Sequence, residues 1–227
     1  MLSGMAAAGR TDPAVRGIVL VIHGGQSVSR QPTSPVQLAV LRMIPVRQAI
    51  RHAVGRSAVV LRPRLALRGW NGAEASPVAD VTGLLEALPG RFGDLPVVLV
   101  GHSLGARAAL RAAGHPSVIA VAGLAPWLPP EEPVAQLAGR RLLLVHGTAD
   151  RITSPATTWQ YARAASDITT VGAIAVDGGD HAMLRRARLW HGLAGEFAGL
   201  ALGAPARDRA LREVVAAARP RGVPVTL

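Results

Sequence analysis

Six short apolar runs constrain the fold of this 227-residue chain more than any other feature of its sequence. None of them alternates between polar and apolar residues, and each is bounded by glycine, proline or polar residues. Continuous apolar runs of this length are typical of strands that are covered on both faces, as in a parallel sheet. The runs are residues 18–22, 58–61, 97–100, 118–122, 142–145 and 171–176.

Helical segments are expected between these runs, at residues 37–54, 78–88, 103–113, 155–165 and 183–202. Pro45 should kink or split the first of them. The alternation of strand and helix predicts one doubly wound α/β domain over residues 18–202, with about six mainly parallel strands. We expect residues 1–17 to be a flexible N-terminal segment. Residues 203–227 should form a C-terminal extension, with a short helix within 207–219 and then a tail.

The composition limits the classes of partner. A formal net charge of +11 alone would suggest a nucleic-acid partner. However, all 25 basic residues are arginine, and they are scattered without the interleaved aromatic residues that single-strand binding uses. This pattern indicates the coding bias of a GC-rich genome, so we expect no nucleic-acid partner. The absence of cysteine excludes disulfides and cysteine-based metal sites.

Hydrophobic patterning argues against a membrane protein. The apolar runs are far shorter than the roughly 18 residues that a membrane helix needs. The N-terminal residues contain no apolar stretch of signal-peptide length. We therefore expect a cytoplasmic protein with no membrane partner, and the sequence does not indicate an oligomeric state.

Ser103 is the strongest candidate for a chemically active side chain. It stands between Gly101 and Gly105 in a G-x-S-x-G motif, directly after the apolar run 97–100 and before a helical segment. Such a turn needs residues without side-chain bulk, because the strand and the helix pack closely at a strained corner. The serine then lies at a helix N-terminus, where backbone N–H groups are unpaired. A serine that merely caps the helix is the plainer alternative.

A serine hydroxyl needs a base, and the base needs a carboxylate. His181 is the best base, because it lies just past the last apolar run in a loop that contains glycine. Asp150 follows the fifth run and is the best acid. Asp177 and Asp180 are rival acids, but both lie in the histidine's own loop, where making a turn is their expected role. The chain order of Ser103, Asp150 and His181 is nucleophile, acid, base.

Backbone N–H groups can stabilise the negative charge that develops on a substrate oxygen. We expect one from Leu104, which follows the serine. The second should come from the glycine-rich loop after the first run, from either Gly25 or Gln26. His23 and His146 also follow strands, each just before a glycine, and are expected to shape loops by hydrogen bonding.

Together these motifs resemble the α/β-hydrolase superfamily. The chain looks like small hydrolases of GC-rich actinobacteria that are grouped with dienelactone-hydrolase-like enzymes. The resemblance implies a Ser-His-Asp mechanism that needs no cofactor and no metal. The residues that carry it are His23-Gly24-Gly25, Gly101-His102-Ser103-Leu104-Gly105, His146-Gly147 with Asp150, and Gly179-Asp180-His181.

Two departures from the superfamily pattern are informative. Only 17 residues precede the first run, so the antiparallel hairpin that usually stands there should be missing. The segment between residues 125 and 142 is too short for a lid of several helices. We expect a shallow, open pocket that takes small soluble esters with short acyl chains. Trp70 and Trp127 are candidate walls of this pocket, and Arg68 is a candidate contact for an acidic substrate, although rim packing and a solvated charge are the plainer interpretations.

The sequence thus predicts a serine hydrolase, of the carboxylesterase kind, that acts on small-molecule esters. Thioesterase, amidase or acyltransferase activity would use the same three residues. A non-catalytic ligand-binding protein on the same fold is the alternative from another class. A dinucleotide-binding protein is not expected, because no G-x-G-x-x-G motif opens a helix.

Overall fold

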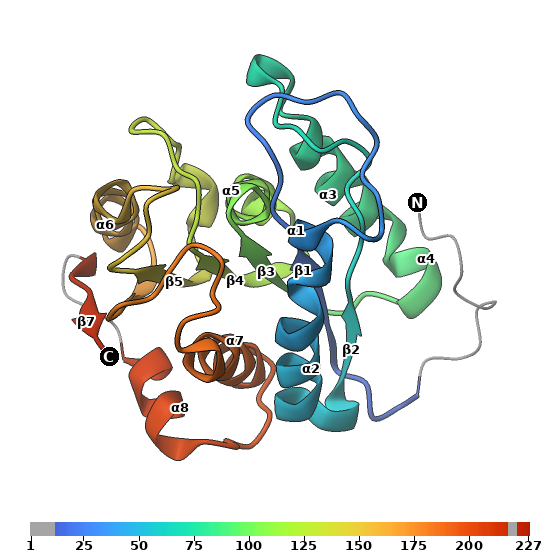
Figure 1. Ribbon diagram of the computed structural model, residues 1–227. Coiled ribbons are helices and arrows are strands. Elements are labelled where there is room, and N and C mark those ends of the chain that lie inside the picture. Colours follow the sequence, from blue (N-terminus) through green and yellow to red (C-terminus); the bar gives the residue numbers. More distant parts are fainter. Residues whose placement is uncertain (1–11, 218–221) are drawn as a thin grey trace.

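The computed structural model describes residues 12–217 and 222–227 (Figure 1). Most of the expected flexible segment, residues 1–11, lies outside the described residues, and so do residues 218–221 of the C-terminal extension.

A seven-stranded sheet forms the centre of the fold, in the order β2-β1-β3-β4-β5-β6-β7, and every strand pair is parallel. Each of the six apolar runs lies within one of the first six strands. The prediction of a doubly wound parallel sheet is therefore confirmed. The strands are β1 (Gly17–Ile22), β2 (Ala58–Leu61), β3 (Val97–His102), β4 (Val118–Leu124), β5 (Arg141–Gly147), β6 (Thr170–Val176) and β7 (Val225–Thr226).

The seventh strand is an addition to the expected count of about six. β7 has only two residues and pairs with β6 through Ile174 opposite Val225 and Ala175 opposite Thr226. A pair of residues is too short to give a recognisable apolar run, so the sequence predicts a tail here. The end of the described chain instead extends the sheet at its β6 edge.

Eight α-helices connect the strands in the described residues. The expected break near Pro45 falls at Arg42, which separates the first two helices. Pro45 then lies in the first turn of the second helix, where its missing N–H costs no hydrogen bond. The helices are α1 (Leu38–Leu41), α2 (Met43–Val54), α3 (Ser76–Ala87), α4 (Pro89–Phe92), α5 (Leu104–Arg111), α6 (Pro155–Ser166), α7 (Ala187–Ala201) and α8 (Arg209–Ala216).

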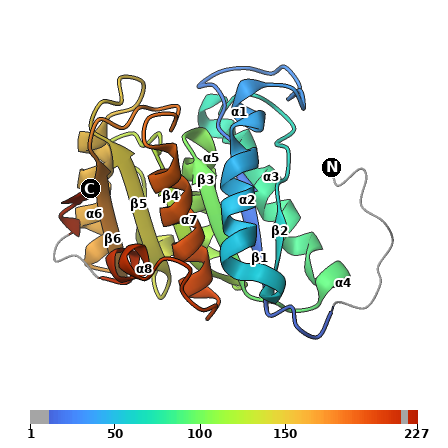
Figure 2. The same cartoon turned by 60° about the horizontal axis from the view of Figure 1, so that its bottom comes forward.

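The helices cover both faces of the sheet (Figure 2). Helices α2, α7 and α8 pack on one face, where Val19 and Val21 point, while α3, α5 and α6 pack on the other, where Ile18 and Leu20 point. Successive residues of a strand point to opposite faces, so a strand covered on both sides must be apolar throughout. This is why the runs do not alternate.

The connection between β4 and β5 is short. Between β4 and β5 the chain forms only one 3-10 turn, η4 (Ala135–Leu137), and no lid helix. Among the described residues no strand precedes β1. No helix in residues 12–217 and 222–227 is long and apolar enough to cross a membrane.

Candidate active site

The turn from β3 into α5 holds Ser103 in a strained backbone conformation, with φ of 54° and ψ of −120°. A Cβ added at Gly101 would lie 2.4 Å from the Gly105 carbonyl oxygen, and one added at Gly105 would lie 2.3 Å from the His23 carbonyl oxygen. Neither contact is possible, so both positions need glycine. A positive φ at a serine costs energy and persists only where the surrounding structure enforces it.

Three side chains from three strand ends meet in one line of hydrogen bonds. His181, in the loop after β6, places Nε2 3.1 Å from the Ser103 Oγ. Its Nδ1 lies 2.8 Å from Asp150 Oδ2, which comes from the loop after β5. Because a carboxylate only accepts, Nδ1 carries the proton in this arrangement and Nε2 is free to accept the serine proton.

The Asp150 carboxylate is buried and fully hydrogen-bonded. Burial alone would favour its neutral form, but hydrogen bonds from His146 and His181 and from the Thr153 and Ile152 backbone N–H groups hold its pKa well below the usual range. Asp150 is therefore an anion at neutral pH. A buried anion beside His181 stabilises the imidazolium that forms when the ring takes up a proton.

His102, next to the serine, holds the loop that carries His181. Its Nε2 lies 2.8 Å from the His181 carbonyl oxygen, and the two rings stand 4.9 Å apart. Burial, with a smaller effect of the nearby His181, lowers the pKa of His102 to about 3. The ring is thus neutral, and Nε2–H is the donor. Its Nδ1 is buried and finds no hydrogen-bond partner in the part of the chain that the structure describes.

Hydrogen bonds in the loop after β1 distinguish the two candidates for the second oxyanion donor, Gly25 and Gln26. The Gln26 N–H donates to the Arg68 carbonyl oxygen at 2.8 Å, so it is already used. No hydrogen bond occupies the Gly25 or the Leu104 N–H among the described residues. His23 shapes this loop, with Nδ1 2.7 Å from the Gly24 carbonyl oxygen and Nε2 accepting from the Leu65 N–H at 3.1 Å.

The two tryptophans form a cage around an arginine. Trp70 and Trp127 stand edge to face, 6.1 Å apart, and the Arg107 guanidinium lies 3.8 Å from the centre of the Trp70 ring. Arg107 Nε donates to the buried Glu132 carboxylate at 2.7 Å. Trp70 is buried, Trp127 is partly buried, and the backbone N–H of Trp127 donates to the Ser103 carbonyl oxygen. Both rings pack against the apolar core on the side of the sheet that α3, α5 and α6 cover.

Arg68 is held by the neighbouring loop. Its Nε donates to the Pro32 carbonyl oxygen at 3.0 Å and its Nη1 to Gln31 Oε1 at 2.7 Å. These bonds give Arg68 a role in bracing the loop, while Arg107 is the arginine that lies among the tryptophans.

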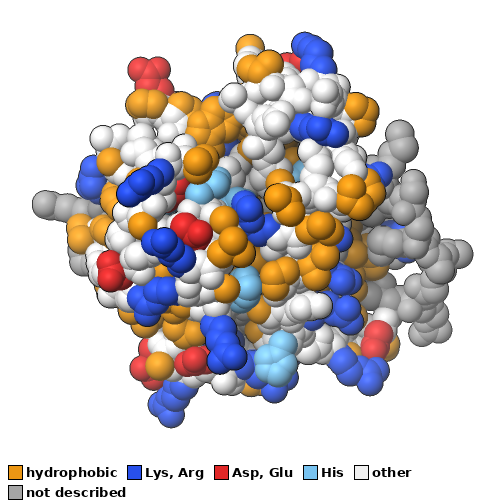
Figure 3. Space-filling model, viewed as in Figure 1, with side chains coloured by type: hydrophobic (Ala, Val, Ile, Leu, Met, Phe, Trp, Pro, Cys, Tyr) orange, Lys and Arg blue, Asp and Glu red, His pale blue; other side chains and the backbone are white. Residues whose placement is uncertain are grey.

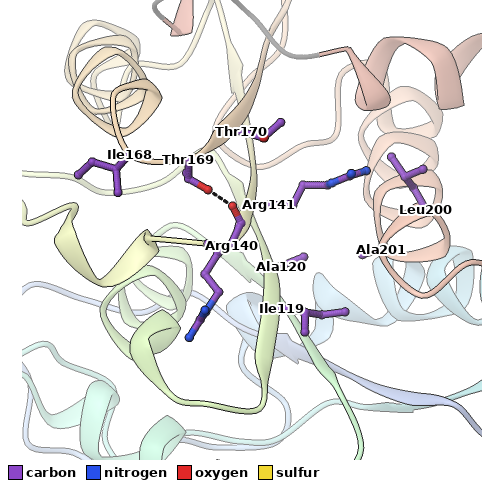
Figure 4. A pocket seen from close by; sticks show the side chains of 10 residues that line it. Ile119, Ala120, Arg140, Arg141, Ile168, Thr169, Thr170, Leu200 and Ala201 are labelled. Carbon is purple, nitrogen blue, oxygen red and sulfur yellow. Dashed lines mark hydrogen bonds between the residues drawn. The ribbon is translucent and has the colours of Figure 1, made fainter.

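A cleft borders the His181 ring, between residues 149–152 and residues 180–185. Another hollow lies at the opposite edge of the sheet, where β4, β5 and β6 begin (Figure 4). There the Thr169 hydroxyl donates to the Arg140 carbonyl oxygen, and no residue of the Ser103 site takes part. The hollow at the beginning of the strands is therefore separate from the chemistry.

The face of the molecule in Figure 3 carries charges of both signs. Arginines are scattered over the face in Figure 3, with acidic and apolar side chains between them. No group of three or more histidine, cysteine or acidic side chains with the spacing of a metal site occurs in the residues that the structure describes.

Some important residues were not identified from the sequence. The sequence H-G-T-A-D places His146 and Asp150 four residues apart. Nothing in that spacing shows that the His146 ring turns toward the Asp150 carboxylate. The Arg107–Glu132 pair is separated by 25 residues and has no local signature. Both depend on how distant loops fold back over the sheet.

No protein-family model matches the sequence, and no curated protein matches it. Solved structures do match. Est1E from Butyrivibrio proteoclasticus has a TM-score of 0.64 at 13% identity, over 84% of this chain and 90% of that one. The esterase domain of a Rhodothermus marinus protein has a TM-score of 0.60 at 18% identity, over 86% and 90%.

An α/β serine hydrolase without a lid, from Xanthomonas campestris, has a TM-score of 0.59 at 19% identity and covers 88% of both chains. The chain therefore has the α/β-hydrolase fold.

Proposed function

We propose that this protein is a serine hydrolase that cleaves carboxylic esters of small soluble molecules through an acyl-enzyme. One observation carries the proposal: the unbroken line of hydrogen bonds from Ser103 Oγ through His181 to Asp150, at 3.1 and 2.8 Å. A serine that only capped the helix would need neither partner, and the Ser103 side chain makes no capping hydrogen bond to α5.

His181 removes the hydroxyl proton as Ser103 Oγ attacks the ester carbonyl carbon. A bond forms between Oγ and that carbon, and the carbonyl oxygen takes the electron pair. His181 then returns the proton to the departing alcohol, which leaves an acyl group on Ser103. Water, deprotonated by the same ring, attacks the acyl carbon. The bond from that carbon to Ser103 Oγ then breaks, His181 returns the proton to Oγ, and the carboxylic acid leaves. Asp150 orients the ring and stabilises its cation throughout.

The Leu104 and Gly25 N–H groups are the donors that we assign to the developing oxyanion. Leu104 opens α5, so its N–H is among those that the helix leaves unpaired. Gly25 is preferred to Gln26, because the Gln26 N–H is already bonded to Arg68. Preorganised backbone donors of this kind are each worth about 3 kcal/mol of transition-state stabilisation.

Small substrates are favoured by the short β4–β5 connection. Only η4 interrupts it, so nothing there encloses a long acyl chain. Short acyl chains should be hydrolysed fastest, and a strong preference for long chains would contradict an open site.

Hydrolysis of p-nitrophenyl acetate tests the proposal. We expect the wild type to turn the ester over and Ser103→Ala to lose at least a thousandfold in kcat. Ser117→Ala is the matched control, because Ser117 precedes β4 at the opposite edge of the sheet and should keep full activity. Wild-type protein that neither hydrolyses esters nor reacts with a fluorophosphonate would be a ligand-binding protein on the same fold.

A further inference from the structure

His146 is a fully buried histidine for which the proposed reaction has no use. It lies near the end of β5 and is 0% exposed. Its Nδ1 is 2.7 Å from the Thr158 Oγ1 on α6, and its Nε2 is 3.0 Å from Asp150 Oδ2. Its ring and the Trp159 ring stand edge to face, with the ring centres 6.2 Å apart.

The partners of the ring fix its tautomer. The Asp150 carboxylate can only accept, and the Thr153 hydroxyl, 3.3 Å from Nε2, gives its proton to Asp150 Oδ2, so the proton of His146 lies on Nε2. In a neutral ring Nδ1 is then an acceptor, and the Thr158 hydroxyl supplies the proton for it. Both nitrogens are satisfied in one arrangement, as buried polar atoms require.

The acceptor is the same carboxylate oxygen that receives His181. Asp150 Oδ2 lies 2.8 Å from His181 Nδ1, 2.9 Å from the Thr153 hydroxyl and 3.0 Å from His146 Nε2. The other oxygen, Oδ1, accepts from the Ile152 and Thr153 N–H groups. Five donors surround the two carboxylate oxygens, more than their roughly four lone pairs, so the group cannot rotate without breaking hydrogen bonds.

We propose that His146 is a positioning residue for Asp150, an inference that rests on the proposed function. It donates Nε2–H to Oδ2 and holds that oxygen where it fixes the tautomer and orientation of His181. Strand β5 and helix α6 hold His146 in turn. The ring touches neither Ser103 nor the cleft beside His181, so it acts only through the carboxylate.

The first test measures the tautomer in the wild-type protein and needs no variant to fold. Histidine is labelled with 15N, and the His146 ring signals are read from their shifts and ring couplings near neutral pH. We expect a proton on Nε2. A proton on Nδ1 alone would leave Nε2 unable to donate to Asp150, and this result would overturn the proposal.

The second test compares His146→Leu with His146→Gln in p-nitrophenyl acetate hydrolysis. Leucine removes the donor, and we expect kcat to fall by about ten- to a hundredfold with KM within twofold of the wild type, because a hydrogen bond to a charged group is lost away from the substrate. Glutamine offers an amide N–H at a similar reach and should recover most of kcat. His115→Leu is the control, since His115 bonds to Ser117 at the opposite edge of the sheet.

The outcomes separate the two claims. A wild type that shows neither turnover nor fluorophosphonate labelling contradicts the proposed function, while the tautomer measurement still decides the hydrogen bond. An active wild type with unchanged kcat in folded His146→Leu overturns the positioning role. Equal losses in the leucine and glutamine variants, accompanied by a raised KM, would also overturn it, because they would indicate a general disturbance of the site.

Discussion

Ser103 owes its position to two glycines and to the backbone around them, so its proposed role as nucleophile depends on residues without reactive side chains. The side chain stands at the corner of a strand and a helix that approach to within contact of each other's backbone. Strain stored at such a corner is maintained by the packing of both elements. Substitutions that add side-chain atoms at this corner should therefore lower the free energy of unfolding.

A pair of glycine substitutions tests this at the residue scale. Alanine at Gly105 would place its Cβ 2.3 Å from the His23 carbonyl oxygen and 2.7 Å from that of Ile22, so β1 or α5 must move. We expect the free energy of unfolding to fall by about 1–3 kcal/mol, the usual cost of overpacking. Gly83→Ala, in α3 with open space around it, should instead gain up to about 1 kcal/mol from helix propensity. Urea denaturation measures both, and equal changes in the two variants would contradict the packing account.

The titration of His102 should make the stability of the fold depend on pH. Its pKa is about 3 in the folded protein and near 6.5 in the unfolded chain, so the unfolded chain takes up the proton first as pH falls. Its contribution to stability is complete above pH about 6.5 and is lost between there and pH about 3, with a slope of up to roughly 1.4 kcal/mol per pH unit. Burial lowers the pKa of His23 and His191 as well, so they add in the same direction.

His102→Gln should flatten this slope, because glutamine does not titrate. The measurement is the free energy of unfolding from denaturant titrations at several values of pH between 4 and 7. His52→Gln, at an exposed position on α2, serves as the control and should keep the wild-type slope. The same slope in His102→Gln as in the wild type would show that His102 is not buried in its neutral form.

At the scale of elements, the β4–β5 connection is attached to α5 by a buried ion cluster. The Glu132 side chain is 0% exposed and accepts from both Arg107 and Arg111. The same connection carries Trp127, whose backbone N–H donates to the Ser103 carbonyl oxygen, so the cluster lies in the segment that contacts the serine turn. The connection thus has a fixed position although it has no helix of its own.

Glu132→Gln should lower the free energy of unfolding by about 2–4 kcal/mol, because it leaves Arg107 buried without its counter-charge. Glu131→Gln provides a matched control at the adjacent, exposed position and should change the free energy by less than about 0.5 kcal/mol. Chemical denaturation compares the two variants. A loss in Glu132→Gln no larger than in Glu131→Gln would mean that the cluster does not hold the connection.

Elements differ in how much of them the sequence predicts. Strands β1 to β6 were predictable because strands buried on both faces must be continuously apolar. β7 was not, since its two residues join the sheet through backbone hydrogen bonds that leave no mark on side-chain type. The Arg107–Glu132 cluster was not either, because arginine and glutamate are ordinary surface residues until tertiary structure buries them.

At the scale of the whole molecule, the parallel sheet explains why distant residues meet. Parallel strands end at the same edge, so the loops after β3, β5 and β6 converge there. The sequence predicted that Ser103, Asp150 and His181 would lie at this edge, and the structure brings them into hydrogen-bond contact. It did not predict that His102 and His146 lie behind them, because the direction of a ring depends on the packing of neighbouring loops.

The proposed hydrolase activity requires Ser103 to be the nucleophile in the intact protein. The most direct measurement is reaction with a fluorophosphonate, followed by digestion and mass spectrometry to locate the adduct. We predict a single stoichiometric adduct on Ser103 that forms in the wild type and is abolished by His181→Ala. An adduct on another residue, or equally fast labelling of Ser103 without His181, would contradict the claim that these side chains act together.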